Sequence, residues 1–178
     1  MPLLKLLEYT SRRGIATHPY PRKPLDVDEL YRGRPVLDAD ACTGCGACAS
    51  ACPAETIRVE VDSERGVKRW SIYYGRCIFC GRCHEVCPVN AIELSREFEL
   101  AARNREDLIA EAELKLGVCI SCNTYLEAAV RQVEAAQQFL ERMPGFTPVM
   151  KELAKYTLMC RKCKAMFFAE KLAEATRG

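Results

Sequence analysis

The sequence predicts an α+β protein in which a short cysteine-rich domain stands between two appendages. Three observations indicate this: a cysteine motif that occurs twice, alternating apolar and polar residues between its copies, and helical periodicity in both flanks. A chain of 178 residues can hold one core domain with a sizeable appendage. We expect an N-terminal helix and docking arm over residues 1–40, the cysteine-rich domain over 41–95, and a mostly helical C-terminal extension over 96–178.

The repeated motif is Cys-x2-Cys-x2-Cys-x3-Cys-Pro, which ends at Pro53 in the first copy and at Pro88 in the second. Such runs are the ligand sets of bacterial-type ferredoxins, which hold [4Fe–4S] clusters through cysteine thiolates. We therefore expect a bacterial two-[4Fe–4S] ferredoxin fold for this domain. Its cysteines are Cys42, Cys45, Cys48, Cys52, Cys77, Cys80, Cys83 and Cys87.

The two motifs are expected to share their ligands crosswise. Three closely spaced thiolates can hold one face of a cubic cluster, and in this pattern the fourth cysteine of each motif binds the other cluster. Cluster one is then bound by Cys42, Cys45, Cys48 and Cys87, and cluster two by Cys77, Cys80, Cys83 and Cys52. Radical chemistry needs an iron with an open position, so fully bound clusters leave one-electron transfer, and we expect no catalytic residue.

The N-terminal flank predicts a helix followed by an extended arm. Leucines at positions 3, 4, 6 and 7 lie toward one side of a helix expected within residues 1–17. This helix either docks on a protein core or lies at a membrane edge. Residues 18–40 are rich in proline, which favours extended chain, and their aromatic and arginine content favours wrapping a partner.

The segment between the motifs predicts a β-hairpin. Residues 57–61 and 67–73 alternate in polarity on either side of a turn that contains Gly66. Ile92 follows the second motif as Ile57 follows the first, so the order of motif, proline, short link and strand occurs twice. An internal repeat of this kind predicts a domain with pseudo-two-fold symmetry.

The C-terminal flank predicts helices with one short strand. We expect residues 96–116 to be rich in helix, apart from a strand at 114–116. Apolar residues recur at helical spacing over 123–142, and Pro144-Gly145 should end that helix. A last helix is expected over 164–175, with its apolar side chains facing a core; these are Phe167, Phe168 and Leu172.

Four further cysteines form two Cys-x2-Cys pairs in this flank, and two such pairs suit a tetrahedral four-thiolate metal site. Zinc would be structural there, whereas a single iron of the rubredoxin type would be redox-active, and geometry alone does not separate the two metals. We favour zinc and keep a single iron, or no metal, as the alternatives. The four residues are Cys119, Cys122, Cys160 and Cys163.

Composition excludes several other classes of protein. All twelve cysteines lie at spacings that suit metal sites better than disulfides. The formal net charge is +2 with neutral cysteines, and three thiolate-bound sites of about −2 each would bring it to roughly −4, so charge gives no case for nucleic-acid binding. We find no signal peptide and no run of about 18 apolar residues. We therefore expect a cytoplasmic protein with reduced, metal-bound thiols and without a transmembrane helix.

The chain resembles the two-cluster ferredoxin-type subunit shared by respiratory complex I and the membrane-bound group 4 [NiFe] hydrogenases. The residues that carry this resemblance are the two motifs, Arg32-Gly33-Arg34-Pro35 and segment 76–83. Its C-terminal Cys-x2-Cys pairs resemble the corresponding subunit of formate hydrogenlyase, since complex I subunits of this type generally lack them. The resemblance implies that electrons pass from an upstream donor subunit or ferredoxin to the hydrogenase small and large subunits, and it allows contact with membrane subunits.

Three alternatives remain open at this point. A complex I-type subunit of an NADH/quinone or ferredoxin oxidoreductase would use the same chemistry in another assembly. A free soluble ferredoxin would not need the extended arm and the added C-terminal region. A zinc-binding interaction module with structural clusters would not need two adjacent cubes. The sequence thus favours a non-catalytic electron-relay subunit of a hydrogenase complex.

Overall fold

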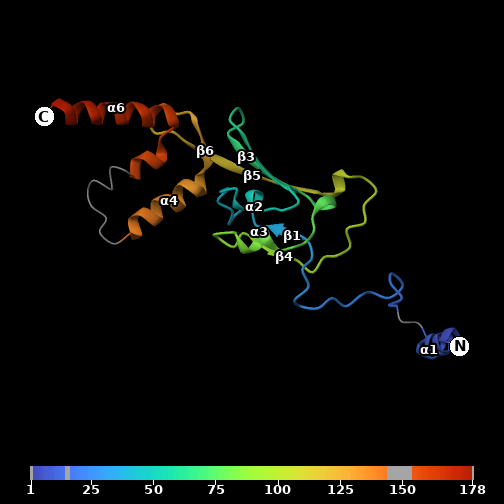
Figure 1. Cartoon of the computed structure of the whole chain (residues 1–178). Coiled ribbons are helices and arrows are strands. Elements are labelled where there is room, and N and C mark those ends of the chain that lie inside the picture. Colours follow the sequence, from blue (N-terminus) through green and yellow to red (C-terminus); the bar gives the residue numbers. More distant parts are fainter. Residues whose placement is uncertain (1, 15–16, 144–153, 178) are drawn as a thin grey trace. The chain divides into compact units, whose positions relative to one another are not determined.

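The computed structural model describes residues 2–14, 17–143 and 154–177, which form a mixed arrangement of helices and sheets (Figure 1). The chain separates into two compact units, one up to Tyr31 and the other from Arg32 onward. Over the described residues, we find no helix that is both long and apolar enough to span a membrane.

The first unit contains helix α1 (Pro2–Arg13), and its described residues after that helix, 14 and 17–31, form no regular helix or strand. The helix expected from the leucine pattern is therefore confirmed. It ends before Gly14, whose φ of 65° lies in the left-handed region that glycine adopts most easily. Arg12 forms an ion pair with Glu8 one turn earlier, at 2.6 Å. The leucines of its apolar side are each more than half exposed.

In the second unit, two antiparallel strand pairs repeat one another around the cysteine motifs. Strand β1 (Pro35–Leu37) pairs with β4 (Ile92–Leu94), and β2 (Ile57–Asp62) pairs with β3 (Val67–Tyr73). Each pair joins a strand that precedes one motif to the strand that follows the other motif. The predicted hairpin and the predicted strand at residue 92 are both confirmed. Helices α2 (Ala47–Ser50) and α3 (Arg82–Glu85), one in each motif, contact each other (Figure 1).

The backbone repeats this symmetry at positions of positive φ. Gly46 and Gly81 precede α2 and α3 with φ of 78° and 79°. Gly44 has φ of 68°, and Phe79, at the equivalent place in the second motif, has φ of 54°. A third pair is Glu55 and Asn90. Since the members of every pair lie thirty-five positions apart, the internal repeat expected from the sequence is present in the backbone.

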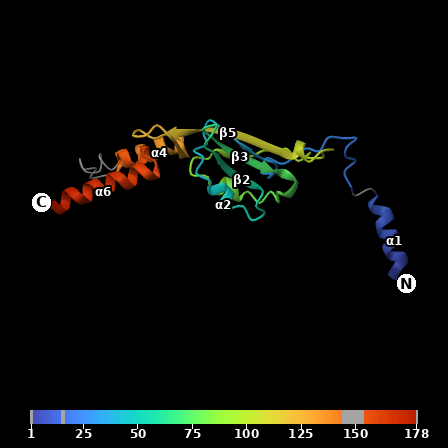
Figure 2. The same ribbon diagram turned by 90° about the horizontal axis from the view of Figure 1, so that it is seen from above.

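The helix-rich structure expected over residues 96–116 is wrong. Residues 109–118 form strand β5 (Ile109–Val118), which pairs with β3 from Val67 to Tyr73 and then with β6 (Tyr125–Ala129). The sheet order is β2-β3-β5-β6, and β2, β3 and β5 are labelled in Figure 2. The short strand expected at 114–116 lies inside β5. Residues beyond 95 therefore continue the sheet of the cysteine-rich domain, and the domain limits 41–95 and 96–178 stay a prediction.

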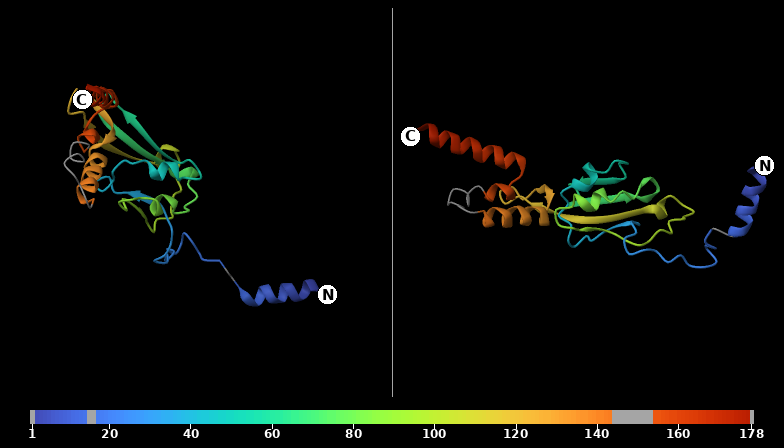
Figure 3. Two further views of the ribbon diagram at one scale, coloured as in Figure 1. Left: turned by 60° about the vertical axis from the view of Figure 1, so that its left-hand side comes forward. Right: turned by 60° about the horizontal axis from the view of Figure 1, so that its bottom comes forward.

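The C-terminal helices also differ from expectation in detail. Helix α4 (Val130–Arg142) begins later than residue 123, because residues 125–129 pair with β5 as a strand before the helix starts (Figure 3). The expected helix end at Pro144-Gly145 lies outside the described residues. Helix α6 (Arg161–Arg177) contains the helix expected over 164–175. Phe168 and Leu172 are 56% and 64% exposed, so the inward orientation expected for them is wrong, whereas Phe167 packs against a buried cluster.

Among the described residues of the second unit, buried side chains form two clusters. The first is centred on Trp70 and Ile72 of β3 and includes Cys83 of the second motif. The second cluster contains Cys119, which follows β5, together with residues of β6 and α4. Between β1 and the second motif, the buried Tyr74 hydroxyl donates a hydrogen bond to the Pro35 carbonyl at 2.7 Å. The first cluster contains Cys83 and the second contains Cys119, so each includes a cysteine of the sites described below.

We expect Gly66→Ala to destabilise the β2–β3 turn. Gly66 has φ of 67°, and a Cβ atom there would overlap the ring of Tyr125 on β6. We expect a loss of about 2–3 kcal/mol, because left-handed backbone strain adds to a steric clash. In a Tyr125→Ala background the clash is gone, and the loss should fall to about 1 kcal/mol. Thermal unfolding of the four proteins measures this, and an equal loss in both backgrounds would contradict the contact.

Candidate metal centres

The thiols of the first motif lie around α2 and receive backbone hydrogen bonds. Gly44 donates its N–H to Cys42 Sγ at 3.3 Å, as its left-handed conformation permits. Ala91 donates in the same way to Cys87 Sγ at 3.1 Å. Amide donors of this kind stabilise negative charge on sulfur, and around iron–sulfur clusters they tune the reduction potential.

Cys87, the last cysteine of the second motif, lies beside the first set. Burial raises the pKa of Cys42, the Gly44 N–H opposes this, and the nearby thiols of Cys45 and Cys87 raise it further. Burial also raises the pKa of Cys48, with smaller contributions in the same direction from Cys42 and Cys45. Charge interactions of this kind weaken with distance, so Cys42 has both Cys45 and Cys87 as neighbours.

The second set of thiols lines one cavity. Cys52 of the first motif lies on its wall together with Cys77, Cys80 and Cys83 of the second motif. Burial raises the pKa of Cys77, the backbone N–H of Phe79 opposes it, and Cys52 adds to it. Burial likewise raises the pKa of Cys83 to about 11. The cysteines expected to share a cluster crosswise are therefore neighbours, and their assignment as ligands stays a prediction.

The thiols of both sets fit iron–sulfur clusters. Thiolate is the ligand that such clusters require. The thiol of Cys52 lies 3.4 Å from the hydroxyl of Thr56. Burial raises the pKa of Cys52, but hydrogen bonds from Thr56 and from the backbone outweigh it, so that pKa is lowered. Cys48 and Cys83, which occupy equivalent places in the two motifs, pack against the same buried cluster and interact electrostatically, so the two sets meet there.

Two side chains of β3, which lie outside the cysteine motifs, also lie close to the first set of thiols. Lys68 interacts with the thiols of Cys45 and Cys42, and its Nζ donates to the Glu127 carbonyl at 3.2 Å. Trp70 is 2% exposed, and its indole N–H meets no acceptor at hydrogen-bonding geometry among the described residues. This N–H nonetheless lies near enough to Cys48 to oppose the effect of burial on the pKa of that thiol. The two residues share one face of β3, and the period-two pattern of the predicted strand could have indicated this.

The third set is gathered at the end of β5. The Sγ atoms of its four cysteines all lie within 4.8 Å of one another, and the residues are Cys119, Cys122, Cys160 and Cys163. The first pair forms a tight turn: Cys119 donates its N–H to the Thr124 carbonyl at 2.8 Å, and Asn123 donates to the Cys119 carbonyl at 3.0 Å. Asn123 closes this turn with φ of 58°. Asparagine is among the few residues other than glycine that adopt this conformation readily.

The second pair of this set stands at a helix N-terminus. Cys160 directly precedes α6, and Cys163 lies in its first turn, where Lys164 donates to the Cys160 carbonyl at 2.9 Å. Cys160 also donates its backbone N–H to Cys119 Sγ at 3.2 Å, which joins the two pairs. Backbone donors, first that of Cys160 and then that of Cys122, lower the pKa of Cys119 to about 6. The N-terminal end of a helix also favours thiolate charge, so this set is suited to a cation.

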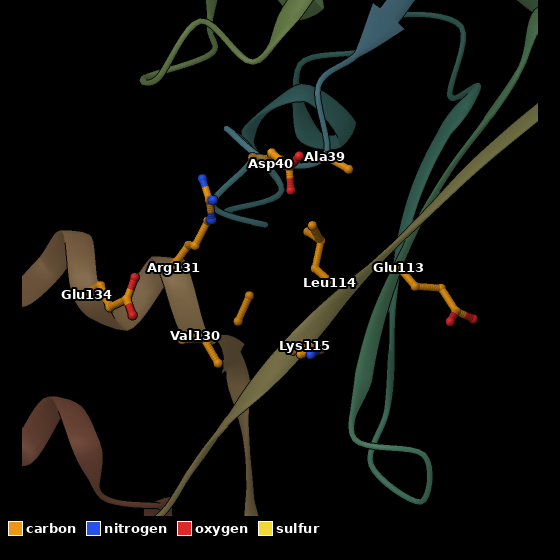
Figure 4. Close-up of a pocket in the computed structure, with 10 residues that line it drawn as sticks. Ala39, Asp40, Glu113, Leu114, Lys115, Val130, Arg131 and Glu134 are labelled. Carbon is orange, nitrogen blue, oxygen red and sulfur yellow. The ribbon is translucent and has the colours of Figure 1, made fainter.

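A pocket of about 430 Å³ lies beside Cys42. Figure 4 shows Asp40 on one side of it, Leu114 of β5 on another, and Arg131 and Glu134 projecting from α4. Acidic and basic side chains are mixed in its lining, so the charge of the pocket favours neither anions nor cations, and we assign it no ligand. The pocket does place the loop of the first motif next to β5 and α4.

Comparisons with known proteins show what the chain is similar to. Residues 41–91 match the family model of the 4Fe-4S dicluster domain. The chain is 45% identical over 112 residues to formate hydrogenlyase subunit 6 of Escherichia coli (strain K12), a match that covers 63% of this chain and 62% of that protein. It is 36% identical over 112 residues to NADH-quinone oxidoreductase subunit I 2 of Symbiobacterium thermophilum, covering 56% of this chain and 47% of that protein.

Among solved structures, a chain of the membrane-bound sulfane sulfur reductase (MBS), an archaeal respiratory membrane complex, matches with a TM-score of 0.44 and 30% identity, covering 58% of this chain and 56% of that chain. The matches to both curated relatives span less than two thirds of the relatives' lengths. The resemblance expected from the sequence is confirmed, because one curated relative is named as a subunit of formate hydrogenlyase and the other as a subunit of NADH-quinone oxidoreductase.

Proposed function

We propose that this chain, a relative of formate hydrogenlyase subunit 6 with a 4Fe-4S dicluster domain at residues 41–91, is a non-catalytic electron-transfer subunit of a membrane-bound [NiFe] hydrogenase complex. The observation that carries the proposal is the presence of two neighbouring sets of thiols in one small domain. Bound [4Fe–4S] clusters supply one-electron transfer. The chain's own residues hold the clusters and set the charge around them.

The ligand assignment follows the crosswise sets. The proposed ligands of cluster one are Cys42, Cys45, Cys48 and Cys87, and those of cluster two are Cys77, Cys80, Cys83 and Cys52. The interaction of Cys42 with Cys87 and the cavity shared by Cys52 and the second motif support this assignment. Because each motif completes the other's site, both motifs contribute ligands to both clusters.

For the third set we propose structural zinc. Rubredoxin-type iron sites usually have glycine after the second cysteine of each pair. Here Asn123 and Lys164 follow, and although Asn123 adopts a conformation typical of glycine, Lys164 lies within α6. This departure supports zinc over the single-iron alternative. Cys119 is buried within the cluster formed by β6, α4 and η3 (Lys155–Leu158), so the metal would fasten these elements to the end of β5.

We further propose that the chain is fixed in its assembly, on the cytoplasmic side and peripheral to the membrane. Its partners would be hydrogenase small and large subunits and an upstream donor subunit or ferredoxin. Identity to the formate hydrogenlyase subunit exceeds identity to the NADH-quinone oxidoreductase subunit, 45% against 36%, which supports the hydrogenase assembly. The exposed leucines of α1 support a docked subunit over a freely diffusing ferredoxin.

Metal analysis of the anaerobically purified full chain tests the cofactor assignment. We expect about eight irons and one zinc per chain. In the fully reduced protein, with both clusters reduced, electron paramagnetic resonance should show two interacting spins. Nine irons without zinc would overturn the zinc assignment, and four irons or a single isolated spin would overturn the relay. Purification from the native cell tests the assembly, since recovery as a lone monomer would contradict a fixed subunit.

A further inference from the structure

The internal repeat identifies positions around the two thiol sets that should be equivalent. Trp70 lies opposite Val59 in the β2–β3 pair, and Pro35 lies opposite Leu94 in the β1–β4 pair. Val59 and Leu94 stand at the same distance along the chain after Pro53 and Pro88. Pro35 is therefore the counterpart of Trp70. By the same offset, Gly33 is the counterpart of Lys68.

Trp70 presents a donor beside the first set. Cys48 packs against the buried cluster that contains Trp70, and the buried indole N–H finds no acceptor at hydrogen-bonding geometry among the described residues. A buried donor without an acceptor is costly, and the sulfur atoms of a bound cluster and its thiolates are acceptors of the kind that it lacks. Its counterpart Pro35 lines the cavity of the second set, has no N–H, and uses its carbonyl to accept the Tyr74 hydroxyl.

Lys68 adds a partly buried positive charge at the same place. Its Cδ lies 3.3 Å from the position that a Cβ on Gly44 would take, in the loop between Cys42 and Cys45, and its ammonium group is held by the Glu127 carbonyl of β6. Gly33, its counterpart, has no side chain. Near the second set, Arg32 and Arg82 are exposed: Arg32 donates to the Cys80 carbonyl at 3.3 Å, and Arg82 is paired with Glu85 at 2.9 Å. Arg34 is partly buried beside the Tyr74 ring, and its charge is paired with Glu97. Exposed charges are screened by water and salt more than partly buried ones.

We propose that Trp70 and Lys68 make the cluster held by the first set the more easily reduced of the two, so that a single electron in the domain resides there. Reduction adds one negative charge to a cluster and breaks no bond, and a nearby donor and cation stabilise that charge. The inference depends on the proposed function for the presence of both clusters. It goes further in ranking them, and it assigns positioning roles to two residues outside the motifs.

A redox titration of the full chain, followed by electron paramagnetic resonance, tests this ranking. Wild-type protein should show two separate midpoint potentials. Trp70→Phe keeps an aromatic ring and removes the N–H. We expect it to lower the equilibrium constant for reduction of one cluster about tenfold, which lowers the midpoint potential of that cluster by about 59 mV for a one-electron couple. The more positive potential should fall while the more negative one stays. A fall in the more negative potential, an equal fall in both, or no change would overturn the proposal.

Lys68 gives a second, independent measurement. Lys68→Met removes the charge and keeps the aliphatic stem, and it should lower the same potential as Trp70→Phe. Lys68→Arg keeps the charge and should restore the wild-type potential; a fall as large as that of Lys68→Met would contradict an electrostatic role. Tyr125→Phe removes a hydroxyl from an exposed ring and should move neither potential. Iron content measured on each sample separates loss of a cluster, which concerns the proposed function, from a change of potential.

Discussion

Cys87→Ala is expected to remove the same cluster as Cys45→Ala, although Cys87 belongs to the other motif. Cys87 is a neighbour of Cys42, so its loss leaves one corner of cluster one without a ligand. Iron should fall from about eight to about four per chain. The resonance signal that survives should be the same in both variants. Iron analysis and the spectrum of the reduced protein measure this outcome.

The matched control is Cys80→Ala, because Cys80 occupies in the second motif the place of Cys45 in the first, and both are exposed. It should remove cluster two and leave the other signal. If the spectrum of Cys87→Ala matched that of Cys80→Ala, each motif would bind its own cluster and the crosswise assignment would be wrong. Serine variants at the same positions retain an oxygen ligand, and they allow the comparison even where an alanine variant loses both clusters.

Cys122→Ser is expected to release the metal of the third site and to loosen the buried cluster around it. Cys122 is exposed, so the substitution disturbs little packing and its effect reports loss of the metal. Structural zinc sites contribute about 10–16 kcal/mol of apparent binding free energy, which is coupled to folding. We therefore expect zinc to fall from about one to below about 0.1 per chain, with all eight irons retained. Amide hydrogen exchange in β6 and α4 should become at least about a hundredfold faster.

Ser121→Ala, in the same turn, provides the control and should keep both the metal and the exchange protection. Retention of zinc and of slow exchange in Cys122→Ser would contradict a structural four-thiolate site. Loss of one iron in place of zinc would support the rubredoxin-type alternative. The iron–sulfur signals serve as an internal reference, because Cys122 belongs to neither of the other two sets.

Strand β5 shows why part of the fold could not be predicted from the sequence. Ala110, Ala112 and Leu114 alternate with Glu111 and Glu113, a period-two signal. Alanine and glutamate favour helix, so local propensity opposed that signal. The pairing of β5 with β3 decided the outcome, because strand propensity depends on neighbouring strands more than on the residue itself. The beginning of α4 moved for the same reason, since β6 pairs with β5 before the helix starts.

The exposure of apolar side chains on α6 could not be predicted from the sequence either. Phe168 and Leu172 follow a helical pattern and were expected in a core, yet both are exposed on α6. An apolar side chain shows only that burial would be favourable, not that this chain supplies the covering surface. The four cysteines of the third set, by contrast, come together as the spacing of the two pairs led us to expect.

The sequence by itself determined which chemistry to expect, because the cysteine spacings can be recognised without knowing which residues are neighbours in space. The internal repeat and the hairpin could be recognised from the sequence for the same reason. Only the tertiary structure decided which residues surround each site. It brought Cys87 beside Cys42, and it turned Lys68 and Trp70 toward one set while Pro35 stands beside the other. These relations depend on strand pairing between residues far apart in the chain, and side-chain charge and hydrogen bonding act only over the short distances that such pairing creates.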